Sequence, residues 1–438
     1  MVIEFSVGNY KSFKDRVTLS MVAANLVSED KRLDENNVFT QDKDLRLLKS
    51  AAIYGANASG KSNLISALKF MRKFILNSSK DTQADESIAV ERFRLSRETV
   101  DQPSFFELVF VLDAKRYRYG FEVTNEGVVS EWLFYVPTIR EAKLFERKNG
   151  KIDTATAFKE GKDLVDRTRG NALFLSVVAQ FNGPLAKKIL RWFRNLNVIS
   201  GLDDTGLRLY TMKLLDDSNS REEVLKFVTR LDVGIDDIQL HKSPLTMPPT
   251  GDMPEELRTV LKALYGELQK MSPDKAAEQV SVLTSHRVVG ANGESVGVES
   301  FDIDASESEG TKKIFSIAGP VLNTLQKGKV LVVDELDARL HPLITKAIIG
   351  LFNSNETNPH NAQLIFATHD TNLLNRRAFR RDQVWFAEKD RVGATHLYSL
   401  AEFKVRNDAS FETDYIQGRY GAIPFVGSLN NLLGNAHE

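Results

Sequence analysis

The chain has no cysteine among its 438 residues. This absence excludes a disulfide framework, a thiolate metal site and a cysteine nucleophile, and it favours a reducing, intracellular setting. The N-terminus lacks a basic segment followed by an apolar one, and no apolar run reaches the roughly 20 residues that span a bilayer. We therefore expect a cytoplasmic protein that makes no membrane contact.

An excess of charge of one sign is also lacking, since 58 Lys+Arg oppose 59 Asp+Glu and leave a formal net charge of −1. This balance excludes a globally basic nucleic-acid coat, but a sum over the chain does not exclude a local basic patch. No heptad pattern is sustained, so a long coiled-coil arm is not expected. With 42% hydrophobic and 9% aromatic residues, the composition is that of a packed protein of two or three domains, at about 150 residues each.

Hydrophobic periodicity predicts an α/β protein. Alternating apolar residues predict strands at 2–7 and 17–22 and an antiparallel meander over 105–145. Residues 184–231 have helical spacing, and a proline-rich break precedes a further helix over 254–271. Strands and helices alternate after residue 280, which indicates a mostly parallel sheet. These strands are expected at 280–286, 330–333, 363–368 and 383–387, with helices at 309–325 and 342–352.

The strongest motif is a glycine-bounded loop between a buried strand and a helix. Residues 55–62 (GANASGKS) fit G-x-x-x-x-G-K-[ST], follow the apolar run 51–54 and precede an amphipathic helix over 61–76. Glycines let consecutive N–H groups and the helix N-terminus point at phosphates, Lys61 supplies a cation, and the Ser62 hydroxyl can ligate Mg²⁺. The pattern in this context predicts a phosphate loop rather than an ordinary glycine turn.

A second strand ends in two carboxylates. Residues 329–335 (KVLVVDE) deliver Asp334 and Glu335 to the carboxyl end of a predicted parallel strand, where the ligands of such sheets bind. Asp334 is suited to hold Mg²⁺, and Glu335 can act as a general base on an attacking water. Taken alone, residues 329–335 fit an edge strand that ends in solvated acids as well as they fit a nucleotide site. Because the chain also has a phosphate loop, the nucleotide site is favoured.

A histidine follows the next apolar strand. Residues 364–367 (LIFA) lead into Thr368, His369 and Asp370. His369 can contact a γ-phosphate and sense its loss, whereas a histidine at a strand end is more often a structural or surface residue. His341 has the same two interpretations, and both stay open on the residues alone.

This set of motifs resembles the ATP-binding-cassette (ABC) ATPases of the SMC/RecF/OLD class. The shared features are an early phosphate loop, a D-E strand in the distant C-terminal half, a following histidine, and residues 9–13 (NYKSF), which resemble the N-F-[RK]-S-F start. The class signature L-S-G-G-Q is reduced to residues 308–311 (SEGT), as in the AAA15-type (RloA/AbiL-like) subgroup. Residues 382–390 and 418–424 also resemble that subgroup.

The resemblance implies an α/β, ABC-type ATPase head with a split nucleotide-binding core, an antiparallel β meander and a helical accessory lobe. Residues 1–199 would hold the phosphate loop and meander, 200–275 the helical lobe, and 276–438 the signature, the D-E strand and the switch histidine. ATP and Mg²⁺ are the implied cofactors. In a homodimer or higher homo-oligomer, ATP would lie between the phosphate loop of one protomer and the signature serine of another.

The resemblance also assigns roles to individual residues. Glu335 and His369 would be the catalytic residues. Ser62, Asp334 and a glutamine-loop residue would bind Mg²⁺. Gln180 is the candidate for that residue, although a glutamine after an apolar run is usually a helix-end residue. The implied ATP contacts are Gly55, Asn57, Gly60, Lys61, Ser62, Asn63, Ser308 and Gly310, with Lys11 as a further candidate.

The length of the chain after His369 reduces the number of candidate functions. Too few residues follow His369 for an attached nuclease domain of ordinary size, so we expect a separate effector protein, RloB-like or Toprim-like, to supply any damaging activity. The first candidate function is an ATPase sensor and scaffold of an antiphage (abortive-infection) system. The alternatives are a RecF-like DNA-binding ATPase in repair and a non-hydrolysing nucleotide-dependent module, which the presence of Asp334 and Glu335 disfavours.

Two basic segments bear on the DNA-binding alternative. Residues 140–194 have an excess of lysine and arginine, and residues 376–381 (RRAFRR) place four arginines around one phenylalanine. They can contact phosphate backbones or an acidic partner. A solvated helix face balanced by acids such as Asp370 and Asp382 is at least an equally good interpretation.

Overall fold

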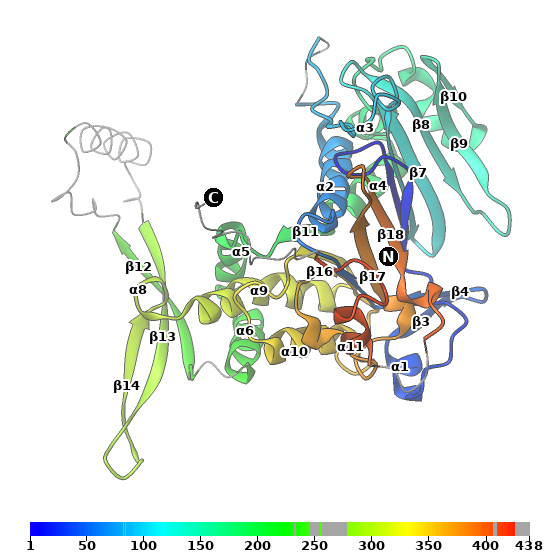
Figure 1. Cartoon of the computed structure of the whole chain (residues 1–438). Helices are drawn as coiled ribbons and strands as arrows, with labels where there is room; N and C mark the ends of the chain where they lie inside the picture. Colours follow the sequence, from blue (N-terminus) through cyan, green and yellow to red (C-terminus); the bar gives the residue numbers. More distant parts are fainter. Residues whose placement is uncertain are drawn as a thin grey trace, which may run out of the picture. The chain divides into compact units, whose positions relative to one another are not determined.

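The computed structural model describes residues 1–81, 83, 85–231, 234–244, 255, 278–405 and 410–424. The chain divides into two compact units (Figure 1), the first containing residues 1–202 and 323–438 and the second residues 203–322. The predicted lobe of residues 200–275 begins close to the second unit, but this unit continues to Leu322. The predicted helix over 254–271 lies, apart from residue 255, outside the described residues.

A seven-stranded sheet in the first unit confirms the predicted antiparallel meander. Its strand order is β10-β9-β8-β7-β6-β1-β2, and each neighbouring pair is antiparallel. The five strands of the meander follow one another along the chain, as expected for hairpin connections. The strands are β1 (Val2–Gly8), β2 (Val17–Ser20), β6 (Ser104–Leu112), β7 (Lys115–Val123), β8 (Val128–Tyr135), β9 (Ala142–Lys148) and β10 (Lys151–Thr154).

A six-stranded sheet combines the two ends of the sequence and confirms the predicted α/β class. Its order is β11-β15-β16-β5-β17-β18, parallel throughout except for the last pair. The early strand β5 lies between β16 and β17, which come from the C-terminal half. The strands are β5 (Ser50–Tyr54), β11 (Leu196–Ser200), β15 (Val330–Asp334), β16 (Gln363–Ala367), β17 (Val384–Lys389) and β18 (Thr395–Ser399).

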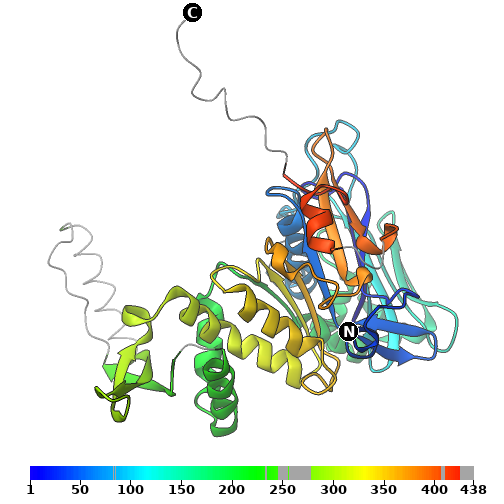
Figure 2. The ribbon, with the colours of Figure 1, turned by 60° about the horizontal axis from the view of Figure 1, so that its bottom comes forward.

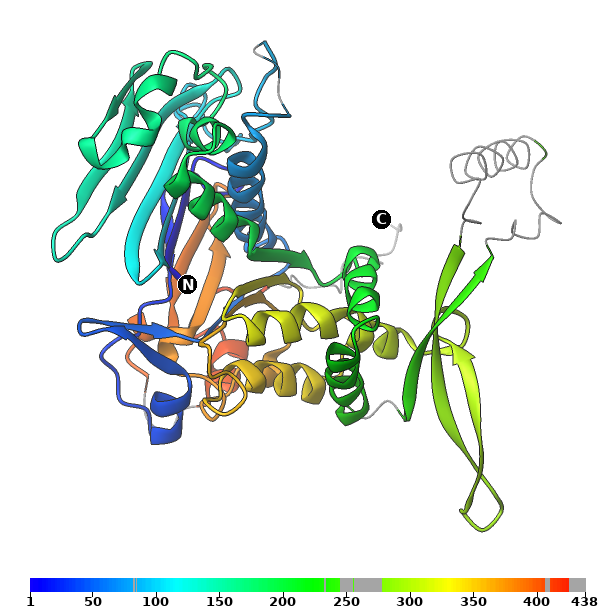
Figure 3. The same ribbon diagram turned by 180° about the vertical axis from the view of Figure 1, so that it is seen from behind.

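Three helices pack against the antiparallel sheet: α2 (Lys61–Asn77), α3 (Phe174–Gln180) and α4 (Pro184–Arg194) (Figure 3). The ring centroids of Phe74 and Phe121 are 5.5 Å apart, and those of Phe110 and Trp192 are 4.4 Å apart. Helix α2 also packs against β11 and β15 of the parallel sheet. Because α2 packs against both sheets, the backbone of its first residue, Lys61, is held in a fixed position.

Besides several 3-10 turns, the first unit contains further α-helices and two more strands. They are α1 (Lys31–Asn36), β3 (Val38–Asp42), β4 (Leu45–Leu48), α10 (Pro342–Phe352) and α11 (Phe411–Ile416). Helix α11, red in Figure 2, lies beside the orange strands β17 and β18, and its Tyr415 ring stacks on Phe386 of β17 at 5.4 Å. Across the described part of the chain, no helix combines the length and the apolar character needed to cross a membrane.

Two buried glutamines bind the C-terminal strands to the N-terminal segment. The Gln363 side chain accepts from the Val2 N–H at 2.6 Å and donates to the carbonyl oxygens of Val2 and Leu48 at 3.0 and 3.1 Å. The Gln383 side chain donates to the Ser50 carbonyl oxygen at 3.1 Å. A buried amide is stable only when it is hydrogen-bonded, so these contacts favour one register between the two halves.

The helical character expected over residues 184–231 is confirmed on both sides of β11, but this strand, which was not expected, interrupts it. Helix α4 ends at Arg194, and β11 then pairs in parallel with β15, with Ser200 opposite Asp334. The strand has only five residues and follows the helix directly. A search for helical spacing over a longer stretch therefore averages over both elements and does not detect the strand. Its consequence for function is that residues 200 and 201 come to lie beside the D-E turn.

The second unit is not purely helical. It contains α5 (Thr205–Leu214), α6 (Ser218–Arg230), α8 (Ile303–Ser306) and most of α9 (Glu309–Gln326), which runs on into the first unit. It also contains a three-stranded antiparallel sheet of β12 (Asp237–Pro244), β13 (Glu278–Val289) and β14 (Ser295–Asp302). The strand expected at 280–286 exists within β13, but placing it in the parallel sheet is wrong, because periodicity reveals a strand without revealing its partners.

Candidate nucleotide-binding site

The predicted phosphate loop connects β5 to α2. Gly60 has a φ of +114°, a left-handed conformation that favours glycine. A Cβ atom at Gly60 would collide with the Thr395 hydroxyl of β18, and one at Gly55 would collide with the Ala387 carbonyl oxygen of β17. The two glycines therefore let the loop pass directly against the neighbouring strands.

Lys61 lies folded back over this loop. Its side chain is buried, and Nζ donates to the carbonyl oxygens of Gly55 and Ala56 at 2.7 and 3.0 Å. Burial lowers the pKa of Lys61, and the nearby charges of Asp334 and Glu335 oppose this shift. Because both acceptors are neutral carbonyls, the described residues give the ammonium no direct counter-ion, and a phosphate would supply one.

Ser62 and Asp334 are brought into contact from positions 272 residues apart. Ser62 Oγ donates to Asp334 Oδ1 at 3.2 Å. Burial raises the pKa of Asp334, while the Ser62 hydrogen bond and the Lys61 and His369 charges partly oppose the rise. Adjacent hydroxyl and carboxylate oxygens fit Mg²⁺. The described residues contain no cluster of three or more acidic or histidine side chains able to hold a metal, so phosphate and water oxygens would complete the coordination.

Glu335, His369 and Lys389 line one cavity of about 520 Å³ together with the phosphate loop. The loop residues at this cavity are Asn57, Ala58, Ser59, Gly60, Lys61, Ser62 and Asn63. Lys389 was not expected at the site, although the carboxyl ends of parallel strands meet at one sheet edge and β17 lies next to β5. The cavity thus collects two lysines, the Glu335 carboxylate and a histidine around the predicted phosphate position, and Asp334 contacts Ser62 of its lining.

The His369 side chain is exposed at the cavity wall, and its partial loss of contact with water lowers its pKa. This partial desolvation is the main cause, and the Lys61 charge adds to it, while Asp337, Glu335 and Asp334 oppose the shift. The backbone N–H of His369 donates to the Asp337 carboxylate at 3.3 Å. At neutral pH the imidazole is therefore uncharged, so one ring nitrogen can donate a hydrogen bond and the other can accept one.

The N-terminal segment of residues 9–13 (NYKSF) supports the phosphate loop through hydrogen bonds of Ser12. Ser12 Oγ accepts from Asn63 Nδ2 and from Thr395 Oγ1, each at 2.8 Å, and Thr395 N–H donates to the Ser12 carbonyl at 2.7 Å. Thr395 Oγ1 also lies 2.8 Å from the Ser59 carbonyl oxygen. Ser12 and Thr395 thereby connect β18, the loop and the start of α2, an arrangement that short-range sequence patterns do not reveal.

Gly55 and Asp334 do not line the cavity but contact residues that do, whereas Lys11 and Gln180 have, within the described part of the chain, no such contact with its lining. Lys11 Nζ donates to Ser66 Oγ at 2.9 Å and lies 3.8 Å from a Glu91 carboxylate oxygen. Gln180 is exposed at the end of α3 and does not line the cavity. Their roles in binding ATP and Mg²⁺ stay predictions.

Ser308 and Gly310 lie in the second unit, where Ser308 caps α9. Ser308 Oγ accepts from the Thr311 N–H at 3.1 Å and lies 2.9 Å from Thr311 Oγ1. Gly310 is the second residue of α9. Their predicted contact with ATP requires a second protomer, so it stays a prediction.

Glu335 has a strained backbone that Gly201 makes possible. Its φ is +56°, an uncommon conformation for a residue with a side chain. The Gly201 N–H donates to the Asp334 carbonyl at 2.6 Å, and a Cβ at Gly201 would collide with the Glu335 carbonyl oxygen. Gly201 directly follows β11, a strand that the sequence patterns did not reveal, and its close approach supports the D-E turn.

Replacement of Gly201 by alanine is expected to displace the D-E turn and lower the kcat for ATP turnover by about tenfold or more. The Kd for ATP should stay within about twofold, because the phosphate loop is untouched. Steady-state phosphate release and equilibrium nucleotide binding measure the two quantities. Gly350→Ala on α10, where a Cβ meets open space, is the matched control. An unchanged kcat in folded Gly201→Ala protein would contradict this assignment.

The arginines of residues 376–381 are partly used inside the fold. Arg380 is buried and forms ion pairs with Asp34 and Asp382, the latter at 2.9 Å, and Arg376 pairs with Glu29 at 2.9 Å. A charge reversal at Arg380 would therefore disrupt the fold before it tested nucleic-acid binding. These contacts favour the structural interpretation of the segment.

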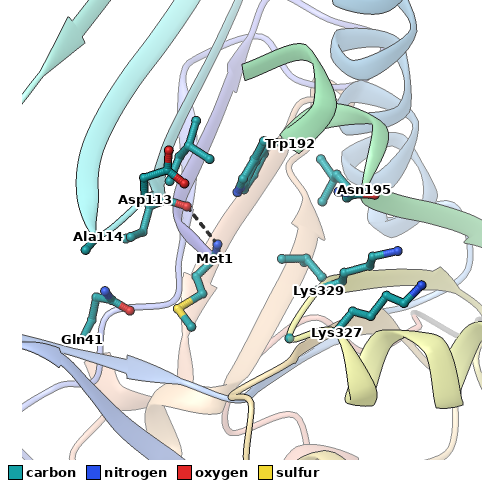
Figure 4. A pocket seen from close by; sticks show the side chains of 13 residues that line it. Met1, Gln41, Asp113, Ala114, Trp192, Asn195, Lys327 and Lys329 are labelled. Atoms are coloured by element: carbon teal, nitrogen blue, oxygen red, sulfur yellow. Dashed lines mark hydrogen bonds between the residues drawn. The ribbon is translucent and has the colours of Figure 1, made fainter. Parts of the chain in front are cut away.

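A second cavity, of about 330 Å³, lies near the amino ends of β11 and β15, away from the phosphate loop (Figure 4). Its lining includes Trp192, Lys327 and Lys329, and the Met1 amino group there donates to the Val111 carbonyl at 3.2 Å. None of the predicted nucleotide contacts lines it.

Known structures and families provide an independent comparison. The chain is similar to an SMC head bound to the C-winged helix domain of ScpA, at 13% identity over 91% of this chain and 97% of that chain, with a TM-score of 0.44. It is similar to the SMC head domain from Thermotoga maritima, at 13% identity over 91% and 98% of the two chains and a TM-score of 0.39. It is also similar to the recombination mediator protein RecF-ATPrS in the RecFOR pathway, at 14% identity over 91% of this chain and 98% of that chain, with a TM-score of 0.33.

The chain matches no curated protein sequence. One family model, described as "AAA domain, putative AbiEii toxin, Type IV TA system", matches residues 50–375. The matched region includes the phosphate loop, the D-E strand and His369. The chain belongs to this AAA-domain family.

Proposed function

We propose that this protein is an ATPase that binds Mg²⁺-ATP in the 520 Å³ cavity and hydrolyses it. The observation that carries the proposal is the contact between Ser62 of the phosphate loop and Asp334 of the D-E strand, at 3.2 Å. It brings the phosphate loop and the D-E strand together at one sheet edge, and Glu335 and His369 line the same cavity as Ser62.

Each residue has a distinct role in the proposed reaction. Lys61 and the loop N–H groups bind the phosphates, and Lys389 adds a second positive charge at the cavity wall. Glu335 accepts a proton from the attacking water, and the neutral His369 orients that water or the γ-phosphate by hydrogen bonding. Mg²⁺, when bound to Ser62 and Asp334, neutralises phosphate charge.

Lys61→Ala is expected to raise the Kd for ATP by about 10- to 100-fold, because it removes a charge-assisted hydrogen bond to phosphate. Equilibrium binding of a fluorescent ATP analogue in the presence of Mg²⁺ measures this change. Lys69→Ala, on the exposed side of the same helix, is the matched control and should leave Kd within about twofold. Equal ATP affinity in the Lys61 variant and the control would contradict a phosphate role for Lys61.

We further propose that two protomers associate head to tail in an ATP-bound homodimer or higher homo-oligomer, in which Ser308 of each completes the site of the other. A phosphate between two helix N-termini gains N–H and dipole contacts from both. Within this scheme the protein is the sensor and scaffold subunit of an abortive-infection system and controls a separate effector. The family description, which names an AbiEii toxin and a type IV toxin–antitoxin system, supports that setting.

Co-expression with the product of the neighbouring gene tests the effector role. Copurification of the two proteins, with an assembly size and effector activity that depend on ATP, is the expected result. If the isolated chain instead binds duplex DNA in an ATP-stimulated manner and ignores the neighbouring protein, the RecF-like alternative is correct.

A further inference from the structure

Glu307, the residue before Ser308, is anchored to β13. Its side chain is only 9% exposed, and Oε1 lies 2.5 Å from Thr284 Oγ1 and 2.6 Å from His286 Nε2. All three residues belong to the second unit. One carboxylate oxygen therefore receives both contacts from alternate residues of a single strand.

The surroundings of this carboxylate make the anchor specific. Thr284 is fully buried, and the His286 ring lies 5.1 Å from the Phe301 ring of β14. A carboxylate removed from water is costly unless its hydrogen bonds are satisfied, so Glu307 strongly prefers the position in which it meets Thr284 and His286. Movement of Glu307 away from β13 would lose both contacts.

Ser308 is consequently held from both sides. On one side, Glu307 is fixed to β13. On the other, Ser308 caps α9 through the Thr311 N–H, and α9 is tied to the start of α5 by a 2.7 Å ion pair between Lys313 and Asp204. The Lys313 side chain has no exposed surface, so breaking its ion pair with Asp204 would leave a buried charge without a partner and would be costly.

We infer that Glu307 is a positioning residue, which sets the place of the signature residue Ser308 from β13 through Thr284 and His286. The inference rests on the proposed role of Ser308 in completing the ATP site of another protomer. If Glu307 has this role, the three-stranded sheet of the second unit determines where Ser308 lies in that site. A displacement of β13 relative to α9 would move Ser308 out of position and stop turnover.

Glu307→Ala is the test. We expect kcat for ATP turnover to fall by about tenfold or more, with Kd for ATP within about twofold, since the phosphate loop is unaffected. Glu307→Gln retains a side-chain oxygen that can accept from Thr284 and should recover part of the rate. The matched control is Glu299→Gln, because Glu299 lies directly opposite His286 on β14 and is exposed. If Glu307→Ala does not fold, Thr284→Val removes one of the two contacts with little change in volume.

A second readout reports the position of the segment itself. Because the chain has no cysteine, Ser308→Cys creates a single thiol, whose rate of reaction with a maleimide measures its accessibility. Adding Glu307→Ala should change that rate, and adding Glu299→Gln should not. A contribution of Glu307 to stability alone would lower the melting temperature but leave the labelling rate and kcat of the folded protein unchanged, which would overturn the inference.

Failure of the inference can be distinguished from failure of the proposed function. If Ser308→Arg abolishes turnover and Glu307→Ala leaves kcat unchanged, the composite site stands and the positioning role is wrong. If neither variant changes turnover, the composite site is wrong, and the role of Glu307 falls with it.

Discussion

Glu335→Gln is expected to lower ATP turnover by about 10²- to 10⁴-fold, because the amide cannot accept the proton of the attacking water. The change keeps the size of the side chain and the +56° backbone conformation of residue 335. Lys61, Ser62 and Asp334 are untouched, so the Kd for ATP should stay within about twofold. Steady-state phosphate release and equilibrium ATP binding give the two values.

The same variant should accumulate in its ATP-bound assembly, since hydrolysis would no longer release it. Light scattering with and without Mg²⁺-ATP measures the assembly size. Glu356→Gln, an exposed residue after α10, is the control and should behave as the unmodified protein does. Normal phosphate release by Glu335→Gln would remove Glu335 from the role of general base and leave His369 to be tested for it.

Ser308→Arg is expected to lower turnover by about 100-fold or more, although residue 308 lies outside the unit that contains the phosphate loop. Ser308 caps α9 with its side chain, and arginine cannot accept the Thr311 N–H hydrogen bond. In the proposed dimer, its bulk would also occupy the position from which the start of α9 would approach the phosphate. ATP binding by a single protomer should persist, which separates this variant from Lys61→Ala.

Mixing Ser308→Arg with Lys61→Ala, at an ATP concentration well below the raised Kd of the Lys61 variant, tests whether the sites are shared between protomers. A mixed dimer of Ser308→Arg and Lys61→Ala has one site with an intact loop and an intact signature, and one site with neither. Random pairing makes half of the dimers mixed, so about one quarter of the unmodified activity should return. If each chain completed its own site, the mixture would recover nothing.

The parts of the site that are contiguous in the chain could be predicted, and the parts that depend on long-range packing could not. The phosphate loop and the D-E strand carry their chemistry in a few consecutive residues, and the cavity contains both. Lys389 joins them only because β17 pairs with β5. No local pattern relates Thr395 to Ser12, which are 383 residues apart and 2.8 Å from each other.

The fold shows the same division. The meander over 105–145 is predictable because its neighbouring strands are also neighbours along the chain. The strand β13 was correctly expected near 280–286, yet it belongs to a sheet with β12 and β14 rather than to the parallel sheet. Gly201 was missed because its function lies in the absence of a Cβ atom, which matters only once β11 lies beside β15.

The position of β5 between two late strands has a consequence for synthesis of the protein. The chain between β5 and β16, residues 55–362, must leave the ribosome before the first neighbour of β5 exists. At about 5–20 residues per second this takes roughly 15 to 60 s. During that time the wholly buried strand Ser50–Tyr54 has no sheet to join. We therefore expect the nascent chain to depend on chaperones through this interval, while the antiparallel sheet, complete by Thr154, folds first.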